Sequence, residues 1–139
     1  MLELVTQEDA IAQLHLDADE SAGTAEGVWL SLAIPAVSEA VALWLKDDWR
    51  LWIPEMDDGK VVVDTSGFPI PALDSSGNPI VRPVVRLAVL VELASQNRFR
   101  EGEGDNGMPD GSQFGSPYGY ILSKGATALL QGLRKSTVA

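Results

Sequence analysis

The sequence predicts a mainly α protein, a small helical bundle with a long β-hairpin-like arm and a long glycine-rich loop, in one domain of residues 1–139. Three observations predict this. The 139 residues are 45% hydrophobic and contain no cysteine, which fits one core without disulfides or thiolate-bound metal. Apolar residues recur at helical spacing near both ends of the chain. Between them, residues 47–83 hold five of the eight prolines and break that spacing.

The first helix is expected to start at Thr6, which can cap it together with Asp9, and to end near His15. Acidic residues from Asp17 to Ser21 offer a second helix start. A long helix then runs from about Thr24 to Trp44, with Pro35 kinking it without breaking it. The side predicted to be buried consists of Trp29, Leu32, Ala33, Ala36, Val37, Ala40, Val41 and Trp44. The narrow side predicted to be exposed to solvent consists of Ser31, Pro35, Ser38, Glu39 and Ala42.

The arm is expected at about residues 53–82, where Lys60–Asp64 reads as a strand and Phe68–Leu73 pairs across a turn with Ile80 and Val81. Pro83 suits the first turn of a helix that ends near Arg100. The loop at about 101–119 contains six glycines. Ser123 caps a last helix. The expected core joins residues from three helices: Trp29, Leu32, Val37 and Val41 with Leu87, Val91 and Leu129.

The charge balance excludes most enzyme classes. The net charge is −10 and His15 is the single histidine, which leaves little material for a metal cluster or a Ser-His-Asp relay. Residues 1–80 hold fifteen acids and three bases, whereas residues 81–139 hold five acids and seven bases. The apolar run 28–45 is interrupted by polar residues, and the start lacks a basic leader. We expect an intracellular product without metal or cofactor.

Three short motifs have better structural explanations than functional ones. Residues 102–107 match G-x-G-x-x-G, but a helix precedes them and two acids would repel a phosphate. Asp17, Asp19 and Ser21 open like a calcium loop, yet Ala22 and Val28 stand where Gly and Glu are required. No nucleophile motif such as G-x-S-x-G occurs in the chain, so a half-buried structural role is favoured for His15.

Tryptophan and arginine supply the candidate interaction residues. Trp49 and Trp52 follow Trp44 closely, but the acids around them oppose nucleic acid, so a core or subunit interface is favoured. Four arginines bracket the third helix and suit the acidic part of a neighbouring copy. The candidate subunit-interface residues are therefore Arg82, Arg86, Arg98, Arg100, Trp49 and Trp52.

The order of elements resembles a known family. A capped helix after Leu4-Val5-Thr6, the run Leu14-His15-Leu16-Asp17, a long helix ending at Trp44-Leu45, an apolar helix to Arg100 and the ending 128–134 (ALLQGLR) follow one another. This order resembles the head-tail connector family of tailed bacteriophages, also called adaptor or head-completion proteins. The arm and the glycine loop are longer than that family leads us to expect.

The resemblance implies a structural virion protein, not an enzyme, that assembles in the host cytoplasm and ends in the neck between capsid and tail. It implies a ring of about a dozen copies that binds the portal protein and a tail or stopper protein, with DNA passing through unbound. The C-terminal segment would then dock on the portal: Arg134, Lys135, Ser136, Thr137, Val138 and Ala139.

Two other classes remain open. An acidic interaction protein or DNA mimic that binds a basic partner would explain the charge of −10, provided that its carboxylates are spaced along one surface. A small hydrolase would have to use His15 as its base.

Overall fold

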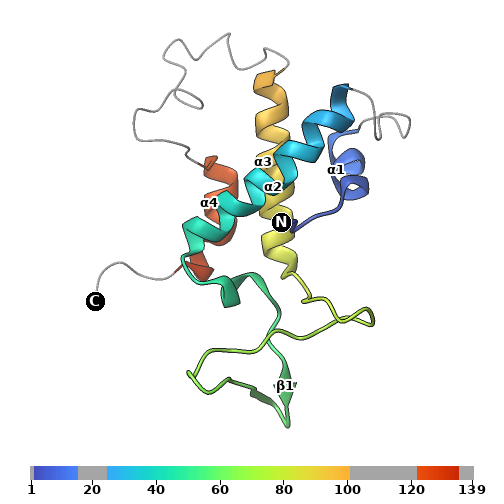
Figure 1. Cartoon of the computed structure of the whole chain (residues 1–139). Helices are drawn as coiled ribbons and strands as arrows, with labels where there is room; N and C mark the ends of the chain where they lie inside the picture. The colour runs from blue at the N-terminus through green and yellow to red at the C-terminus, as the bar shows by residue number, and fades with distance from the viewer. Residues whose placement is uncertain (1, 16–24, 101–121, 135–139) are drawn as a thin grey trace.

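The computed structural model describes residues 2–15, 25–100 and 122–134, without the side chains of residues 26, 99 and 100. The predicted helix start at 17–21 and the glycine loop lie outside these residues. The elements are α1 (Gln7–Leu14), α2 (Ala25–Leu45), the 3-10 helix η1 (Asp48–Leu51), β1 (Met56–Asp57), β2 (Lys60–Val61), α3 (Pro83–Arg100), α4 (Lys124–Leu130) and the 3-10 helix η3 (Gln131–Leu133). The mainly α prediction is confirmed. In Figure 1, α2 crosses α3, α1 and α4 flank that pair, and residues 53–82 project from one end as an arm.

Helix α1 starts and ends where the sequence predicts. The Thr6 hydroxyl accepts a hydrogen bond from the Asp9 amide (3.1 Å), and the Thr6 amide donates to the Asp9 carboxylate (3.4 Å). These two bonds satisfy amide groups that a helix start leaves unpaired. His15 ends the helix in the left-handed conformation, with φ 57°, and its side chain is exposed.

The long helix α2 has the predicted length and continues through Pro35, but it buries a different side from the predicted stripe. Its buried residues are Leu30, Ile34, Val37, Ser38, Val41 and Leu45. Only Val37 and Val41 belong to both sets, and Leu32 is 69% exposed. Because α2 is apolar on nearly every side, two stripes satisfy the three-and-four spacing, and spacing alone could not choose between them.

Ser38 explains part of this choice. The sequence predicts Ser38 on the solvent-exposed side of α2, yet its side chain is fully buried. Its hydroxyl accepts a hydrogen bond from the Leu4 amide (3.0 Å). Leu4 belongs to the extended segment before α1, whose amides have no helix or sheet partner of their own. A buried amide without a partner would cost about 1–3 kcal/mol, so Ser38 faces inward to bind it.

Helices α3 and α4 pack closely on each other. Pro83 opens α3 as predicted, and Ser123 caps α4 by accepting from the Ala126 amide (3.3 Å). Gly125 brings the two helices together, because a Cβ at this position would lie 3.0 Å from a methyl group of Val91. Glu92 of α3 is buried, and its carboxylate accepts from the Ser123 amide (2.8 Å). Glu92 therefore holds the start of α4 against α3.

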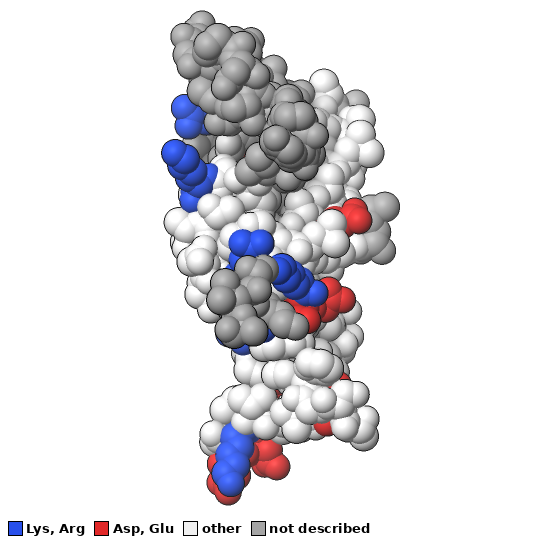
Figure 2. All heavy atoms as spheres, turned by 90° about the vertical axis from the view of Figure 1, so that its left-hand side faces the viewer, with Lys and Arg blue, Asp and Glu red and all other residues white. Residues whose placement is uncertain are grey.

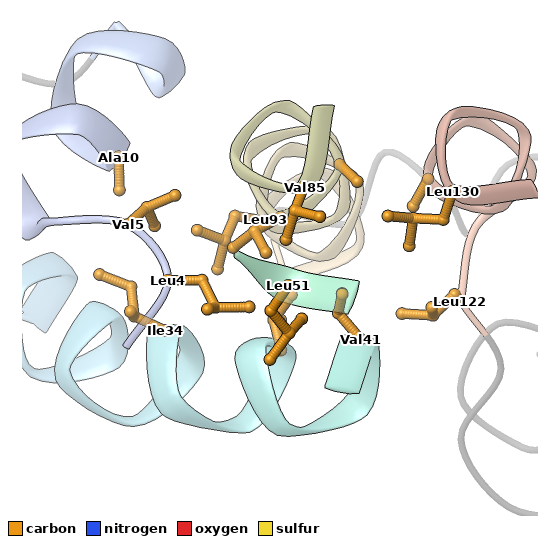
Figure 3. Packing of buried hydrophobic residues seen from close by; sticks show 14 of the residues in the cluster. Leu4, Val5, Ala10, Ile34, Val41, Leu51, Val85, Leu93, Leu122 and Leu130 are labelled. Carbon is orange, nitrogen blue, oxygen red and sulfur yellow. The ribbon is translucent and has the colours of Figure 1, made fainter. Parts of the chain in front are cut away.

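The core lies between α2, α3, α4 and the segment before α1. Figure 3 shows Leu4, Leu51, Val85 and Leu93 pointing toward one another from three parts of the chain: the segment before α1, η1 and α3. Leu87, which the sequence placed in this core, is 44% exposed on α3. The residues that α3 does bury are Val85, Ala88, Val89, Glu92, Leu93 and Asn97. The prediction for Leu87 is wrong because the run 84–94 is apolar on both sides, so helical spacing alone could not identify the side that α3 buries.

The arm consists of three short hairpins instead of the one that the sequence suggests. The strands β1 and β2 form the first, and antiparallel bridges join Val63 to Pro69 and Leu73 to Pro79 in the other two. Backbone hydrogen bonds join the hairpins in two cyclic sets. In the first, Ile53 donates to Ile80, Ile80 to Ala72, and Ala72 to Ile53, over 2.8–3.0 Å. In the second, the same cycle runs through residues 55, 70 and 62. The backbone of the arm is thus paired without a core beneath it.

Two turns of the arm repeat one another ten residues apart, as DTSGFPI at 64–70 and DSSGNPI at 74–80. In each, the aspartate accepts bonds from the amides two and four residues later, over 2.8–3.0 Å. Gly67 and Gly77 have φ of 85° and 83°, which glycine adopts at least cost. The sequence analysis above did not identify this repeat, although it is visible in the amino-acid sequence.

A matched pair of leucines on α3 tests the core. Leu93→Ala removes a fully buried side chain and should lower the free energy of unfolding by about 2–5 kcal/mol. Leu87→Ala, at a position that is 44% exposed, should cost less than about 1 kcal/mol. Urea unfolding of both variants measures the difference, and equal costs would contradict the arrangement of α3.

Candidate functional site

Several candidate residues line open hollows of the surface: Trp52 and Arg86 line one of about 840 Å³, and Trp49 and Trp52 line another of about 380 Å³. Among the described residues, no group of three or more His, Asp or Glu side chains is placed to hold a metal ion. The side chain of His15 is exposed at the end of α1, so the prediction of a half-buried histidine is wrong. Its structural role is that of the backbone, which ends the helix in the left-handed conformation. The features to consider are therefore the arginines, the tryptophans after α2, and the apolar surfaces that this small body leaves open.

The tryptophan cluster is organised by Arg50. Its guanidinium pairs with the Asp47 carboxylate (3.1 Å), donates to the Leu133 carbonyl (2.6 Å) and lies over the Trp49 ring at 4.4 Å. Arg50 therefore ties η1 to the end of η3. The ring N–H of Trp49 is buried and has no hydrogen-bond partner among the described residues. Trp52 packs against the edge of the core, so the core interpretation holds for this residue.

The predicted interface arginines lie in different surroundings. Arg86 forms a salt bridge with Asp9 (3.0 Å) and thereby joins α3 to α1. Arg82 is half-buried at the base of the arm, and its Nε has no hydrogen-bond partner among the described residues. Arg98 is exposed near the far end of α3, and the side chain of Arg100 lies outside the described residues. These side chains do not form one patch, because they are spread along the 18 residues of α3 and the arm before it.

The candidate docking segment is described only at its first residue. Arg134 lies over the Trp44 ring at 4.5 Å, a cation–π contact that joins the end of the chain to α2. Residues 135–139 lie outside the described residues. Arg134 thus contributes to the fold, and the docking prediction for residues 135–139 falls on residues that the structure does not describe.

The outer side of α2 is an apolar groove. Leu32 is 69% and Leu43 is 71% exposed, and an open hollow of about 500 Å³ lies along this side. Its lining residues are Trp29, Leu32, Ala33, Ala36, Val37, Glu39, Ala40 and Leu43 of α2, with Gln96 of α3. Six of them belong to the stripe that the sequence predicted to be buried. The segment Gly27–Leu45 is long and apolar enough to cross a membrane by length and composition, contrary to the expectation above, although a core helix can pass the same test.

The arm carries a second apolar surface, which follows from its register. Paired residues of antiparallel strands lie on the same side of a sheet, and the side alternates along each strand. Five of the six cross-strand pairs are apolar and share one side: Trp52–Val81, Pro54–Pro71, Met56–Val61, Val63–Pro69 and Leu73–Pro79. The sixth pair, Asp57–Lys60, alternates with Met56–Val61 and so lies on the other side. Met56, Val63 and Leu73 are more than half exposed. We call this surface the apolar side of the arm.

The carboxylates of the arm belong to its other side. Glu55, Asp57, Asp64 and Asp74 each alternate with a residue of the apolar side. Asp64 and Asp74 already accept amides of their own turns. Figure 2 shows a contrasting distribution on the face toward α4, where cationic side chains gather over the helical body and carboxylates lie mainly lower down. The acidic excess of residues 1–80 and the basic excess of residues 81–139 are therefore partly separated in space as well.

Neither a family model, nor a curated protein, nor a solved structure matches this chain.

Acid titration tests the tether between α1 and α3. Burial raises the pKa of Asp9, but the bonds from Arg86 and Thr6 outweigh it, so the pKa lies below its usual value of about 4. Because the folded pKa is the lower one, the stabilisation is complete above about pH 4 and is lost as the pH falls through the folded value. Asp9→Asn should lower the free energy of unfolding at pH 7 by less than about 1 kcal/mol. The variant should also lose less stability than the parent as the pH falls below about 4. Thermal unfolding from pH 2 to 7 measures it, and an unchanged loss of stability in acid would contradict the tether.

Proposed function

We propose that this chain is a structural virion protein that forms a ring between portal and tail, extends the DNA channel and completes the head after packaging. The observation that carries the proposal is the amount of apolar surface that one subunit leaves open. A groove on α2 and one side of the arm are both exposed on a single small body. Contiguous exposed apolar surfaces of this kind mark sites of protein association.

The portal and the neck enter the proposal through the resemblance to connector proteins, which the order of helices supports. Two different open surfaces on one subunit suit head-to-tail contacts, which close into a ring when the rotation allows it. The net charge of −10 suits a channel wall from which DNA slides freely, because duplex binding needs lysine and arginine to neutralise phosphates.

An acidic interaction protein or DNA mimic is the second candidate, and the row of carboxylates on one side of the arm favours it. Two of those four carboxylates are engaged by backbone amides, which weakens it. A mimic would be a monomer that displaces DNA from a basic partner.

Native mass spectrometry and negative-stain microscopy of the purified chain test the proposal. We expect closed rings of about a dozen copies, because each subunit has two different open surfaces, one for each neighbour in the ring. A chain that stays monomeric at all concentrations, and that competes with DNA for a basic protein, would replace the ring by the mimic.

The docking role of the C-terminus has its own test. Deleting Ser136–Ala139 together with Lys135→Glu, while keeping Arg134, should leave the thermal transition unchanged because the contact with Trp44 is retained. Such a variant should form rings yet fail to attach to DNA-filled heads. The matched control is Arg134→Ala in the full chain, which should cost about 0.5–1 kcal/mol of stability. Full infectious particles from the deletion variant would contradict the docking role.

A further inference from the structure

The exposed apolar residues of the described chain fall into two main groups. Of the ten large exposed hydrophobic side chains, three belong to α2 and six to the arm: Met56, Val61, Val63, Phe68, Leu73 and Ile80. Of the six arm residues, Met56, Val61, Val63 and Leu73 lie on the apolar side of the arm, whereas Phe68 and Ile80 alternate with it. The surfaces on α2 and on the arm have different shapes. The surface on α2 is a hollow of about 500 Å³, whereas the arm projects from the body as a narrow three-hairpin element (Figure 1). An apolar projection can fill an apolar hollow, so the two surfaces are complementary in shape and in chemistry.

The two surfaces do not cover one another within a subunit. The arm joins α3 at Pro83, and the groove reaches α3 at Gln96, thirteen residues further along. At 1.5 Å per residue this separation is about 20 Å along the helix axis. The high exposure of Leu32 and Leu43 agrees with that distance.

We propose that the apolar side of the arm of one copy packs into the groove on α2 of a second copy. This inference rests on the proposed ring and names the contact that closes it. The arm therefore clasps the neighbouring subunit instead of lining the channel.

Charge decides which surfaces of two copies meet. Residues 53–81 contain five carboxylates and one cation, Lys60, so an arm stacked on another arm would bring like charges together. Two grooves face to face would oppose Glu39 to Glu39, the one charged residue among the lining residues described. An arm on a groove leaves one approach of like charges, between Glu39 and the carboxylates of the arm, which lie on the side of the arm away from the groove.

The rim of the groove on α3 and α4 adds the complementary charge. Gln96 lines the groove and donates to Glu92 (3.1 Å), which also accepts the amide of Ser123. This chain of contacts places the start of α4, with the exposed Lys124, beside the groove, and the exposed Arg98 follows Gln96 on α3. The carboxylates on the outer side of a docked arm would lie near these cations.

The size of the contact bears on how the ring forms. Trp52 and Val81 pack on the core of their own subunit, which leaves eight residues of these pairs on the arm. Eight residues on the arm and nine in the groove are fewer than the roughly 20–30 per partner of a standard interface. One such contact holds a pair weakly. In a closed ring every copy makes two, so assembly should rise steeply with concentration.

Complementing variants test the proposal in the full chain, which contains no cysteine to confuse the oligomeric state. The groove variant carries Leu32→Glu and Leu43→Glu, and the arm variant carries Val61→Glu and Val63→Glu. All four residues are exposed, so both variants should keep the circular dichroism and the thermal transition of the parent. Leu87→Glu, on an exposed position of α3, is the control and should assemble as the parent does.

We expect each variant alone to self-associate at least tenfold more weakly than the parent in analytical ultracentrifugation. An equal mixture should form one-to-one pairs and nothing larger, because only one intact arm and one intact groove remain to meet. Rings of the parent without pairs in the mixture would overturn this contact and leave the ring standing. A monomeric parent that also gives no pairs would overturn both.

A membrane as the occupant of the groove gives a separate result. If the parent floats with vesicles of phosphatidylcholine and phosphatidylglycerol, and the groove variant does not, the proposal is overturned in favour of a lipid surface. Absence of flotation together with pairs in the mixture supports it.

Discussion

A helix that is apolar on nearly every side imposes the main constraint on this molecule. α2 must be covered all round to be out of water, yet the described parts of the chain cover only one side of it. α1, α3 and the segment at Leu4 pack on that side, and Ser38 is the polar residue that this packing tolerates because the Leu4 amide binds it. The other side, with Leu32 and Leu43, stays in solvent. α1 and α3 pack on the covered side of α2, and α4 in turn packs on α3. The uncovered side of α2 gives the chain its capacity for association.

Local signals in the sequence predicted local structure well. Thr6, Pro83 and Ser123 each act through hydrogen bonds or a fixed φ within one turn, so the starts of α1, α3 and α4 could be read directly. The side that a helix buries depends instead on residues far away in the chain. For α2 both sides satisfied the helical spacing, and the choice came from Leu4, thirty-four positions before Ser38. For α3 the sequence predicts Leu87 in the core, yet the helix buries Val89 and Glu92 and leaves Leu87 exposed.

The candidate residues show the same limit. Arg86, Arg134 and Arg50 were visible as cations, but their partners Asp9, Trp44 and Leu133 are separated from them by 77, 90 and 83 positions. Sequence order gave no hint of these contacts. The apolar side of the arm is different, because alternation and the turn repeat at 64–70 and 74–80 were available in the letters. The four prolines of the arm, Pro54, Pro69, Pro71 and Pro79, made its strands hard to recognise, since proline is unusual inside a sheet.

The prolines also explain how an arm without a core keeps its form. Proline fixes φ and lowers the entropy of the unfolded chain, and the aspartate turns hold their own amides, so the hairpins need little burial to be ordered. An element stabilised in this way can afford to keep its apolar side in solvent until another surface covers it. The helical body is stabilised in the opposite way, by burial of Leu30, Val41 and Leu93, and has apolar surface left over on α2. One chain thus presents a preorganised projection and a hollow that accepts it, and preorganisation reduces the entropy lost when they meet.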